Sequence, residues 1–158
     1  YKTKKFITDK YFLMLLPDDL IIKKNCSKSM IAVHQKFKAS VMASMVVNKS
    51  NVSRWGIYNI KKKIDKNNFI INNVVEKPTI KTSPSNNAVI GRYILPKTIF
   101  SKLKSLKPGK GGEFHITDAI QALIEDDHQF IGHNFSGKYL DCGTMKGYIK
   151  STLEISKQ

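Results

Sequence analysis

The sequence predicts an α/β fold, a Rossmann-like mixed and mostly parallel sheet with helices on both faces. Three observations lead to this prediction. Apolar stretches of strand length alternate with segments of helical period, and several strands are continuous apolar runs, as expected when both faces of a sheet are covered. In addition, the 158 residues contain no repeat and no long linker, so residues 1–158 are expected to form one domain around one core.

The first half of the chain predicts four strands and one helix. Residues 11–16 form a buried strand that ends at the turn Pro17-Asp18-Asp19, and Ser27 is the predicted cap of a helix that ends at Phe37. A second apolar strand covers residues 40–47. Two more, residues 55–60 and 69–75, are rich in β-branched and aromatic residues and flank a lysine-rich turn.

The second half begins with a Pro/Ser/Asn loop over residues 77–87. A strand over residues 88–95 and a helix over residues 96–103 follow, then a glycine-rich loop at residues 108–112 and a helix over residues 117–124. Residues 129–134 and 138–140 flank Ser136-Gly137 and predict a hairpin, and residues 144–155 predict the last helix.

Composition narrows the function classes. The net charge is +15, which favours anionic ligands, yet the lysines are scattered and Arg54 and Arg92 are the only arginines. We therefore attribute most of the charge to solvation and keep nucleic-acid binding as a minor alternative. Two distant cysteines predict free thiols in a reducing cytoplasm. No apolar run approaches the roughly 20 residues of a membrane helix, and no signal peptide is expected.

Three acidic residues follow predicted strands, where α/β sheets bind ligands: Asp18, Glu76 and Asp141. Each also has an ordinary structural explanation: a polar turn, an exposed charge pair with Lys77, and a helix cap. Of the neighbours Asp18 and Asp19, one can face a ligand while the other holds the loop. Pro78 predicts an extended Lys77. No motif for a covalent nucleophile or a histidine metal site is present.

Taken together, the motifs resemble those of bacterial UTP–glucose-1-phosphate uridylyltransferases. Residues 15–21 (LLPDDLI) are similar to that family's LPDD segment, residues 74–78 (VVEKP) to its VVEKP motif, and residues 83–95 (SPSNNAVIGRYIL) to its APSNLA–GRY stretch. Residues 54–57 (RWGI), 112–120 (GEFHITDAI) and 137–143 (GKYLDCG) match in the same order. The resemblance covers nearly the whole chain and implies a nucleotidyltransferase-type sheet.

The resemblance also implies roles for individual residues. Asp18 and Asp141 would bind Mg²⁺; Gly56, Glu76 and Val89 would line a glucose pocket; and Lys77 would neutralise the phosphate of glucose 1-phosphate. Asp18 and Lys77 would then be the catalytic residues. The implied reaction converts UTP and glucose 1-phosphate to UDP-glucose and pyrophosphate, and the family commonly forms homo-oligomers.

The chain departs from the family in one respect. The family's first motif, a glycine-rich loop of the GxGTRxxPxTK type that holds the nucleotide phosphates, has no counterpart in the 158 residues. We therefore expect an N-terminally incomplete domain, corresponding to the C-terminal portion of such an enzyme, with an exposed apolar strand edge. Activity would need a complementing N-terminal chain. The alternatives are a non-catalytic remnant that binds sugar phosphate, a glucose-1-phosphate thymidylyltransferase-like enzyme, and a basic nucleic-acid-binding module.

Overall fold

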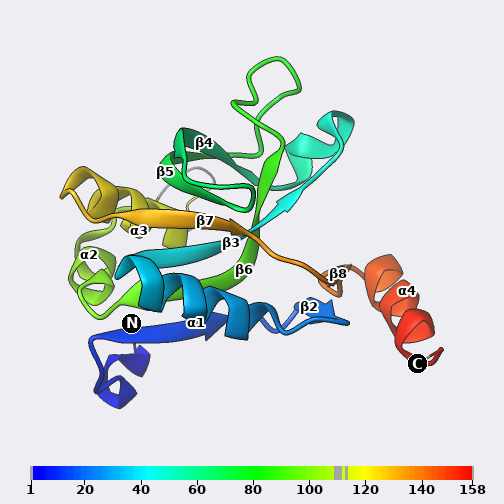
Figure 1. Cartoon of the computed structure of the whole chain (residues 1–158), viewed down its shortest axis with the longest axis horizontal. Helices are drawn as coiled ribbons and strands as arrows, with labels where there is room; N and C mark the ends of the chain where they lie inside the picture. The colour runs from blue at the N-terminus through cyan, green and yellow to red at the C-terminus, as the bar shows by residue number, and fades with distance from the viewer. Residues whose placement is uncertain (1, 109–111, 113, 158) are drawn as a thin grey trace.

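The fold is a six-stranded mixed sheet with helices on both faces, next to a two-stranded sheet (Figure 1). It comes from a computed structural model that describes residues 2–108, 112 and 114–157. The strand order of the large sheet is β1-β6-β3-β7-β5-β4, with one further pairing between β6 and β4. The small sheet pairs β2 with β8. The strands are β1 (Tyr11–Leu15), β2 (Asp19–Ile22), β3 (Ser40–Val46), β4 (Gly56–Lys63), β5 (Asn68–Glu76), β6 (Asn87–Pro96), β7 (Phe130–Asn134) and β8 (Lys138–Asp141).

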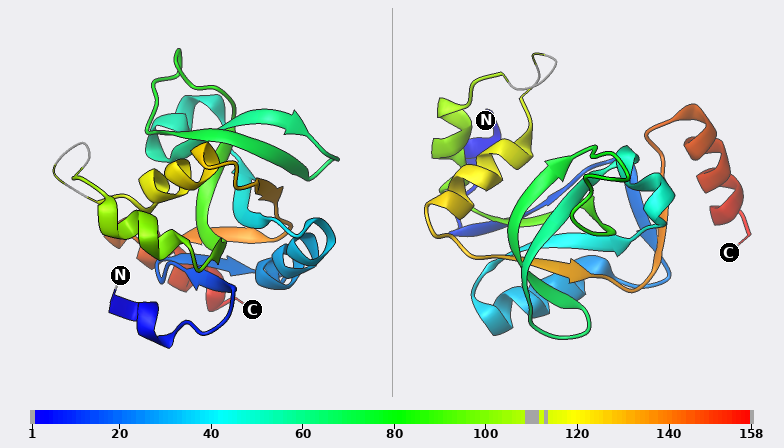
Figure 2. Two further views of the ribbon diagram at one scale, coloured as in Figure 1. Left: turned by 90° about the vertical axis from the view of Figure 1, so that its left-hand side faces the viewer. Right: turned by 90° about the horizontal axis from the view of Figure 1, so that it is seen from above.

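Two layers of helix enclose the large sheet (Figure 2). Helix α1 (Cys26–Phe37) packs on one face, where Met30 and Val33 meet Val41, Ile90 and Ile131. Helices α2 (Ile99–Ser105) and α3 (Ile116–Glu125) pack on the other face. That core contains Met42, Tyr58, Phe69, Ile71, Tyr93, Leu95, Ile99, Phe100, Ala119, Ile120, Leu123 and Phe130. A mixed α/β sheet covered on both faces is therefore confirmed.

The prediction of a mostly parallel sheet is wrong. Among the described residues only β3 and β7 pair in parallel; the other strand pairs are antiparallel. Strands β1, β3 and β7 do run in the same direction, but β6 lies between β1 and β3 and runs the opposite way. A continuous apolar run reports burial of both faces of a strand and contains no information on its direction.

Several local predictions also need correction. Asn25, not Ser27, caps α1, since its side chain accepts from the Lys28 amide at 2.9 Å. Residues 129–134 and 138–140 form no hairpin, because β7 pairs with β3 and β5 while β8 pairs with β2. Asp19 is the first residue of β2, so the predicted turn is shorter. Strand β4 continues through the lysines to Lys63.

Two short 3₁₀ helices and one further helix complete the chain. These are η1 (Lys2–Phe6), η2 (Lys49–Arg54) and α4 (Met145–Ile155). The predicted last helix is confirmed as α4, whose cap Thr144 accepts from the Gly147 amide at 3.1 Å. Residues 109–111 of the predicted glycine-rich loop, and Glu113 after it, lie outside the described residues. No helix in the described part of the chain is long and apolar enough to span a membrane.

Strand β1 forms one edge of the large sheet and pairs only with β6 among the described strands. Leu15, its last residue, is 48% exposed, and Leu16 after it is 38% exposed. An open apolar edge at β1 agrees with the expectation from the sequence. Strands β2 and β8 then extend away from the same end of the sheet and connect it to α4 (Figure 1).

Candidate functional site

Two groups of polar residues lie at one end of the sheet. The first group surrounds Gly56, the first residue of β4, which faces Glu76, the last residue of β5, in the antiparallel register. A Cβ atom at Gly56 would lie 3.0 Å from Glu76 Oε2, 3.0 Å from Val74 Cγ1 and 3.4 Å from Val89 Cγ2. One carboxylate and two valines therefore approach the backbone at Gly56 closely, and a side chain at this position would crowd them.

Three of the predicted sugar-binding residues, Gly56, Glu76 and Val89, are thus neighbours in space although they belong to three strands. Val74 also lies against Gly56 and was missed. Its place two residues before Glu76 puts both side chains on one face of β5, which is a signal that the alternation of a strand could have provided.

Lys77 follows β5 directly and is exposed. Its amide donates to the Trp55 carbonyl at 3.1 Å, which adds one more bond to the end of the β4–β5 ladder. The backbone of Lys77 is not extended as predicted, because its φ is +43°. The Lys77 amide is bonded to Trp55, the residue before β4, and the chain turns away from β5 at this residue. The preference of pre-proline residues for extended backbone is overridden here by this tertiary contact.

The second group surrounds Gly143, at the end of β8. A Cβ atom at Gly143 would lie 2.8 Å from Asp18 Oδ2 and 3.4 Å from Asp141 Oδ1. The Cys142 amide donates to the Asp18 carbonyl at 2.7 Å, and the Gly143 amide donates to Asp141 Oδ1 at 3.0 Å. Asp18 and Asp141, which are distant in sequence, therefore direct their carboxylates to the same small region.

The alternative role of Asp141 as the cap of the last helix is wrong, because Thr144 is the cap of α4.

Asp19 holds the loop that contains Asp18. Its Oδ2 accepts from the Gly91 amide at 2.6 Å, and its Oδ1 accepts from the Tyr139 hydroxyl. Burial, together with the negative charge and hydrogen bond of Asp19, raises the pKa of Tyr139, so this hydroxyl stays a donor. Asp19 therefore holds the loop, as one of the two aspartates was expected to do, while Asp18 is exposed.

Arg92 fixes the backbone around the same loop. Its side chain is only 8% exposed. Its guanidinium donates to the carbonyl oxygens of Leu16 and Gly91, both at 3.0 Å, and to the carbonyl of Asp19. The guanidinium is a rigid fork, and the two bonds that it donates to Leu16 and Asp19 give the loop a defined shape. The conformation of Asp18 is therefore set by a residue on β6, more than 70 positions later in the chain.

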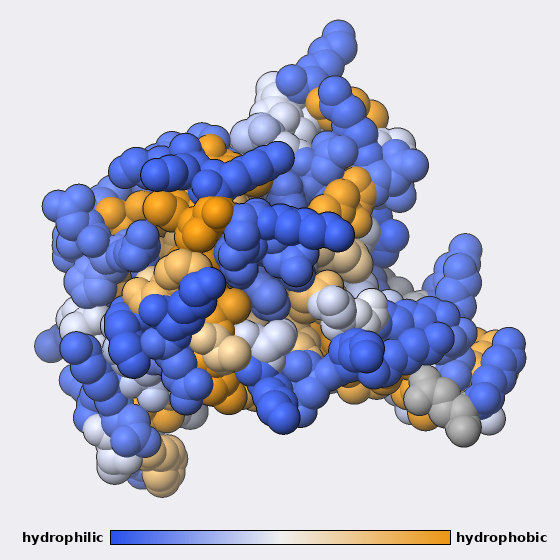
Figure 3. Space-filling model, viewed as in Figure 1, coloured by the Kyte–Doolittle hydropathy of each residue, from blue (hydrophilic) through white to orange (hydrophobic). Residues whose placement is uncertain are grey.

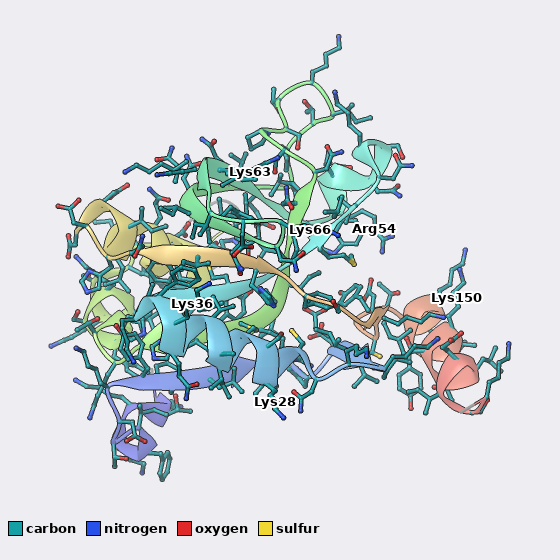
Figure 4. All side chains as sticks on the ribbon, viewed as in Figure 1. Lys28, Lys36, Arg54, Lys63, Lys66 and Lys150 are labelled. Carbon is teal, nitrogen blue, oxygen red and sulfur yellow. The ribbon has the colours of Figure 1, made fainter. Side chains whose placement is uncertain are left out.

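The segment from Arg54 to Gly56 joins the two groups. Arg54 donates to Asp141 Oδ2 at 3.1 Å, the Trp55 carbonyl accepts from Lys77, and Gly56 faces Glu76. A hollow of about 590 Å³ lies beside Arg54 and Asp141, between η2, β8 and α4. Arg54 and Lys150 line opposite sides of it (Figure 4). The contact between Arg54 and Asp141 was missed, because nothing in a spacing of 87 residues indicates it.

The two carboxylates of the second group suit a hard cation. Carboxylate oxygens are the ligands that Mg²⁺ prefers, and Mg²⁺ commonly takes one or two carboxylates with water and phosphate oxygens in its other positions. The described residues contain no cluster of three or more His, Cys, Asp or Glu side chains that could hold a metal. A cation at this place would therefore have no more than two ligands of these four residue types among the described residues.

Comparison with known proteins points to the same family as the sequence motifs described above. The sequence profile of the nucleotidyl transferase family matches residues 1–158. The UTP–glucose-1-phosphate uridylyltransferase of Pseudomonas aeruginosa is 36% identical over 152 residues, which is 94% of this chain and 54% of that protein. The chain therefore spans about half the length of this relative.

Two solved structures are similar throughout the chain. An apo UDP-glucose pyrophosphorylase has a TM-score of 0.91 at 35% identity and covers 98% of this chain, which in turn spans 57% of it. A UDP-glucose pyrophosphorylase complexed with UDP-glucose has a TM-score of 0.89 at 36% identity and covers 99% of this chain, which spans 60% of it.

Proposed function

Because the chain belongs to the nucleotidyl transferase family, we propose that it forms the sugar-phosphate side of a UTP–glucose-1-phosphate uridylyltransferase. The similar protein of P. aeruginosa and the similar structure with UDP-glucose support this substrate class. Since the chain spans 54% of that relative, the contacts to the uracil ring and to the outgoing phosphates are proposed to come from residues outside this sequence.

The observation that carries the proposal is the pairing of two different groups at one end of the sheet. One is the bare backbone of Gly56 beside Glu76 and Val89, and the other is a pair of carboxylates, Asp18 and Asp141. The short segment of Arg54, Trp55 and Gly56 contacts both. A sugar phosphate has a polyol part, which suits the group around Glu76, and an anionic part, which the two carboxylates would bind through a divalent cation.

On the sugar side, each residue has a chemical reason for its place. The exposed carboxylate of Glu76 accepts hydrogen bonds from sugar hydroxyls, and the missing side chain of Gly56 lets the ring approach the backbone. Val89 offers apolar surface to the carbon face of the ring. Lys77, next in sequence to Glu76, neutralises the phosphate with its ammonium group.

On the phosphate side, Asp18 and Asp141 would hold Mg²⁺. When bound, this ion neutralises charge on the phosphates and orients them. The protein residues keep the two carboxylates in place: Asp19 and Arg92 fix the Asp18 loop, and the Gly143 amide fixes Asp141.

The reaction needs no protein nucleophile. A phosphate oxygen of glucose 1-phosphate attacks the α-phosphorus of UTP, the bond to the leaving pyrophosphate breaks, and UDP-glucose forms. Such phosphoryl chemistry depends mainly on alignment and on electrostatic stabilisation of the transferring group. This agrees with a site that consists of carboxylates, one lysine and open backbone.

The test combines this chain with a segment that contains the GxGTRxxPxTK loop and measures pyrophosphate release from UTP and glucose 1-phosphate. We expect Asp18→Asn to lower the rate by about 100-fold, the order of magnitude for losing one electrostatic contact to the transferring group. Asp9→Asn is the matched control, because Asp9 is exposed and lies outside both groups. It should leave the rate unchanged.

Failure of a well-folded mixture to release pyrophosphate would contradict the proposal. A parallel assay with dTTP separates the two enzyme candidates: faster turnover of dTTP than of UTP would identify a thymidylyltransferase. Binding of glucose 1-phosphate by the chain with no turnover in any mixture would identify the non-catalytic remnant.

A further inference from the structure

Arg54 is the one charged partner of Asp141 in the described structure. Its Nη2 lies 3.1 Å from Asp141 Oδ2, and the two side chains are 57% and 30% exposed. Asp141 Oδ1 already accepts from the Gly143 amide at 3.0 Å. Both oxygens of Asp141 are therefore bound by the chain itself, one by a backbone amide and one by a cation.

Arg54 also has a second contact. Its guanidinium carbon lies 4.7 Å from the centre of the Trp55 ring, within the range of a cation–π interaction. The hollow of about 590 Å³ beside it leaves open space for the side chain to turn. Loss of the bond to Asp141 would thus leave Arg54 with another partner and with room to move.

The positive charges near Asp141 disfavour simultaneous binding of its carboxylate to Arg54 and to a divalent cation. Lys146 and Lys150 line the same hollow, while its second acidic residue, Glu154, is paired with Lys138 at 2.5 Å. A divalent cation at Asp141 would add two charges to a region that is already positive. Repulsion at this distance is reduced by solvent but not removed, since the Asp141 side chain is only 30% exposed.

We infer that Arg54 takes the place of the metal at Asp141 and must release this carboxylate before a divalent cation binds there. The inference rests on the magnesium site of the proposed function. Arg54 is a positioning residue: it acts through Asp141 and keeps the carboxylate oriented while no cation is present. It also sets the threshold of Mg²⁺ at which the site fills.

Trp55 supplies a direct readout, because it is the only tryptophan in the sequence. A change in the position of the Arg54 guanidinium over its ring changes the environment of the indole and so its fluorescence. We expect Mg²⁺ to shift the Trp55 emission of the wild-type chain, with a midpoint equal to the Kd measured by calorimetry. Trp55→Phe, which removes the signal, is the control for its origin.

Variants of Arg54 make the test quantitative. Arg54→Gln should bind Mg²⁺ more tightly, by about 3- to 10-fold, since the competing charge of a partly exposed ion pair is gone. Its emission should no longer respond to Mg²⁺. Arg54→Lys retains the charge and should keep an affinity close to the wild type. Because Arg54 is 57% exposed, neither variant is expected to unfold the chain.

The outcomes separate this inference from the proposed function. If Mg²⁺ binds with equal or lower affinity to Arg54→Gln, and Asp141→Asn abolishes binding, the metal site stands and the role of Arg54 is overturned. The role of Arg54 is also overturned if calorimetry records Mg²⁺ binding to the wild type while its Trp55 emission stays constant. If neither the wild type nor Arg54→Gln shows any heat of Mg²⁺ binding, both the proposed magnesium site and the inference about Arg54 are contradicted.

Discussion

At the scale of single residues, the site depends on backbone conformations that ordinary side chains rarely adopt. Lys77 has a φ of +43°, in the left-handed region, next to the glucose-side carboxylate. Such backbone is maintained only where surrounding contacts hold it, here the bond from the Lys77 amide to Trp55. Lys38, the C-cap of α1, has a similar φ of +54° but no contact with the site. The two lysines therefore form a matched pair.

We predict that Lys77→Gly and Lys38→Gly have the same small effect on stability, but that only Lys77→Gly weakens binding. Relief of left-handed strain gains about 1–2 kcal/mol, and the freedom of glycine in the unfolded chain costs about 0.5–1 kcal/mol. Urea denaturation should thus show a net stabilisation of about 0–1.5 kcal/mol for both. Calorimetry should show glucose 1-phosphate affinity reduced about 10-fold for Lys77→Gly only, as expected from loss of one charge-assisted contact. Equal affinities of the two variants would contradict the role of Lys77.

His133 is a residue whose protonation is linked to folding. It is 7% exposed, and its ring contacts Asn68 Oδ1 at 2.8 Å and Ser29 Oγ at 3.1 Å. Burial lowers the pKa of His133 below its usual 6.5, although the charge of Asp65 offsets part of this effect. The folded state therefore binds a proton less readily than the unfolded chain does.

The sign of the pH dependence follows. The stabilisation from neutral His133 is fully present above pH 6.5 and is lost as the pH falls toward the lowered pKa. We predict that the free energy of unfolding decreases from pH 7.5 to about pH 5 and that His133→Gln, which keeps hydrogen-bonding capacity, reduces this slope. Urea denaturation at each pH measures it. An identical slope in the variant would show that other groups are responsible.

At the scale of elements, the close pairing of β5 and β7 depends on Gly132. A Cβ atom there would lie 2.1 and 2.2 Å from two atoms of the Phe69 ring, which is 3% exposed and faces Gly132 in the register. The Phe69 ring occupies the space that a side chain at position 132 of β7 would fill. Strand β5, which leads to Glu76 and Lys77, is positioned on the sheet by this contact.

Gly132→Ala is therefore expected to destabilise the protein by about 1–3 kcal/mol, the usual range for overpacking a filled core. Chemical denaturation provides the measurement. The double variant Gly132→Ala with Phe69→Leu should recover part of the loss, because the smaller side chain frees the space that the new methyl group needs. Additive losses would instead point to a backbone effect of the alanine.

Strand β1 shows why the position of a strand can be predicted correctly while its pairing partner is not. Its apolar run gave the right position, and the free edge was expected from the sequence. The antiparallel β6 beside it was not expected, because pairing partners are set by crossovers far along the chain. The same holds for β8, which was assigned to a hairpin with β7 but pairs with β2.

At the scale of the whole molecule, charge is the dominant property. Hydrophilic side chains cover most of the face shown in Figure 3, and the net charge is +15. Both arginines are engaged within the chain, Arg54 with Asp141 and Arg92 with backbone carbonyls. This gives no support to base readout by arginine, which the nucleic-acid alternative would need.

Self-repulsion of this charge should make stability salt-dependent. We predict that the Tm rises when NaCl is increased from about 0.05 M to about 0.5 M, because screening weakens the repulsion between like charges. Thermal denaturation followed by circular dichroism measures it. The double variant Lys49→Glu with Lys81→Glu, two exposed positions, should show a smaller rise. A Tm that does not depend on salt would show that the charges are too dispersed to matter.

The sequence by itself determined the motifs of the family and the positions of most strands and helices. These depend on local properties: the order of residues within a motif, the apolar period and the turn residues. The tertiary structure alone decided the antiparallel pairing of β6, the left-handed backbone of Lys77 and the contact of Arg54 with Asp141. Each of these joins residues that are distant in the chain, and the free energy of such contacts outweighs local preference without leaving a local signal.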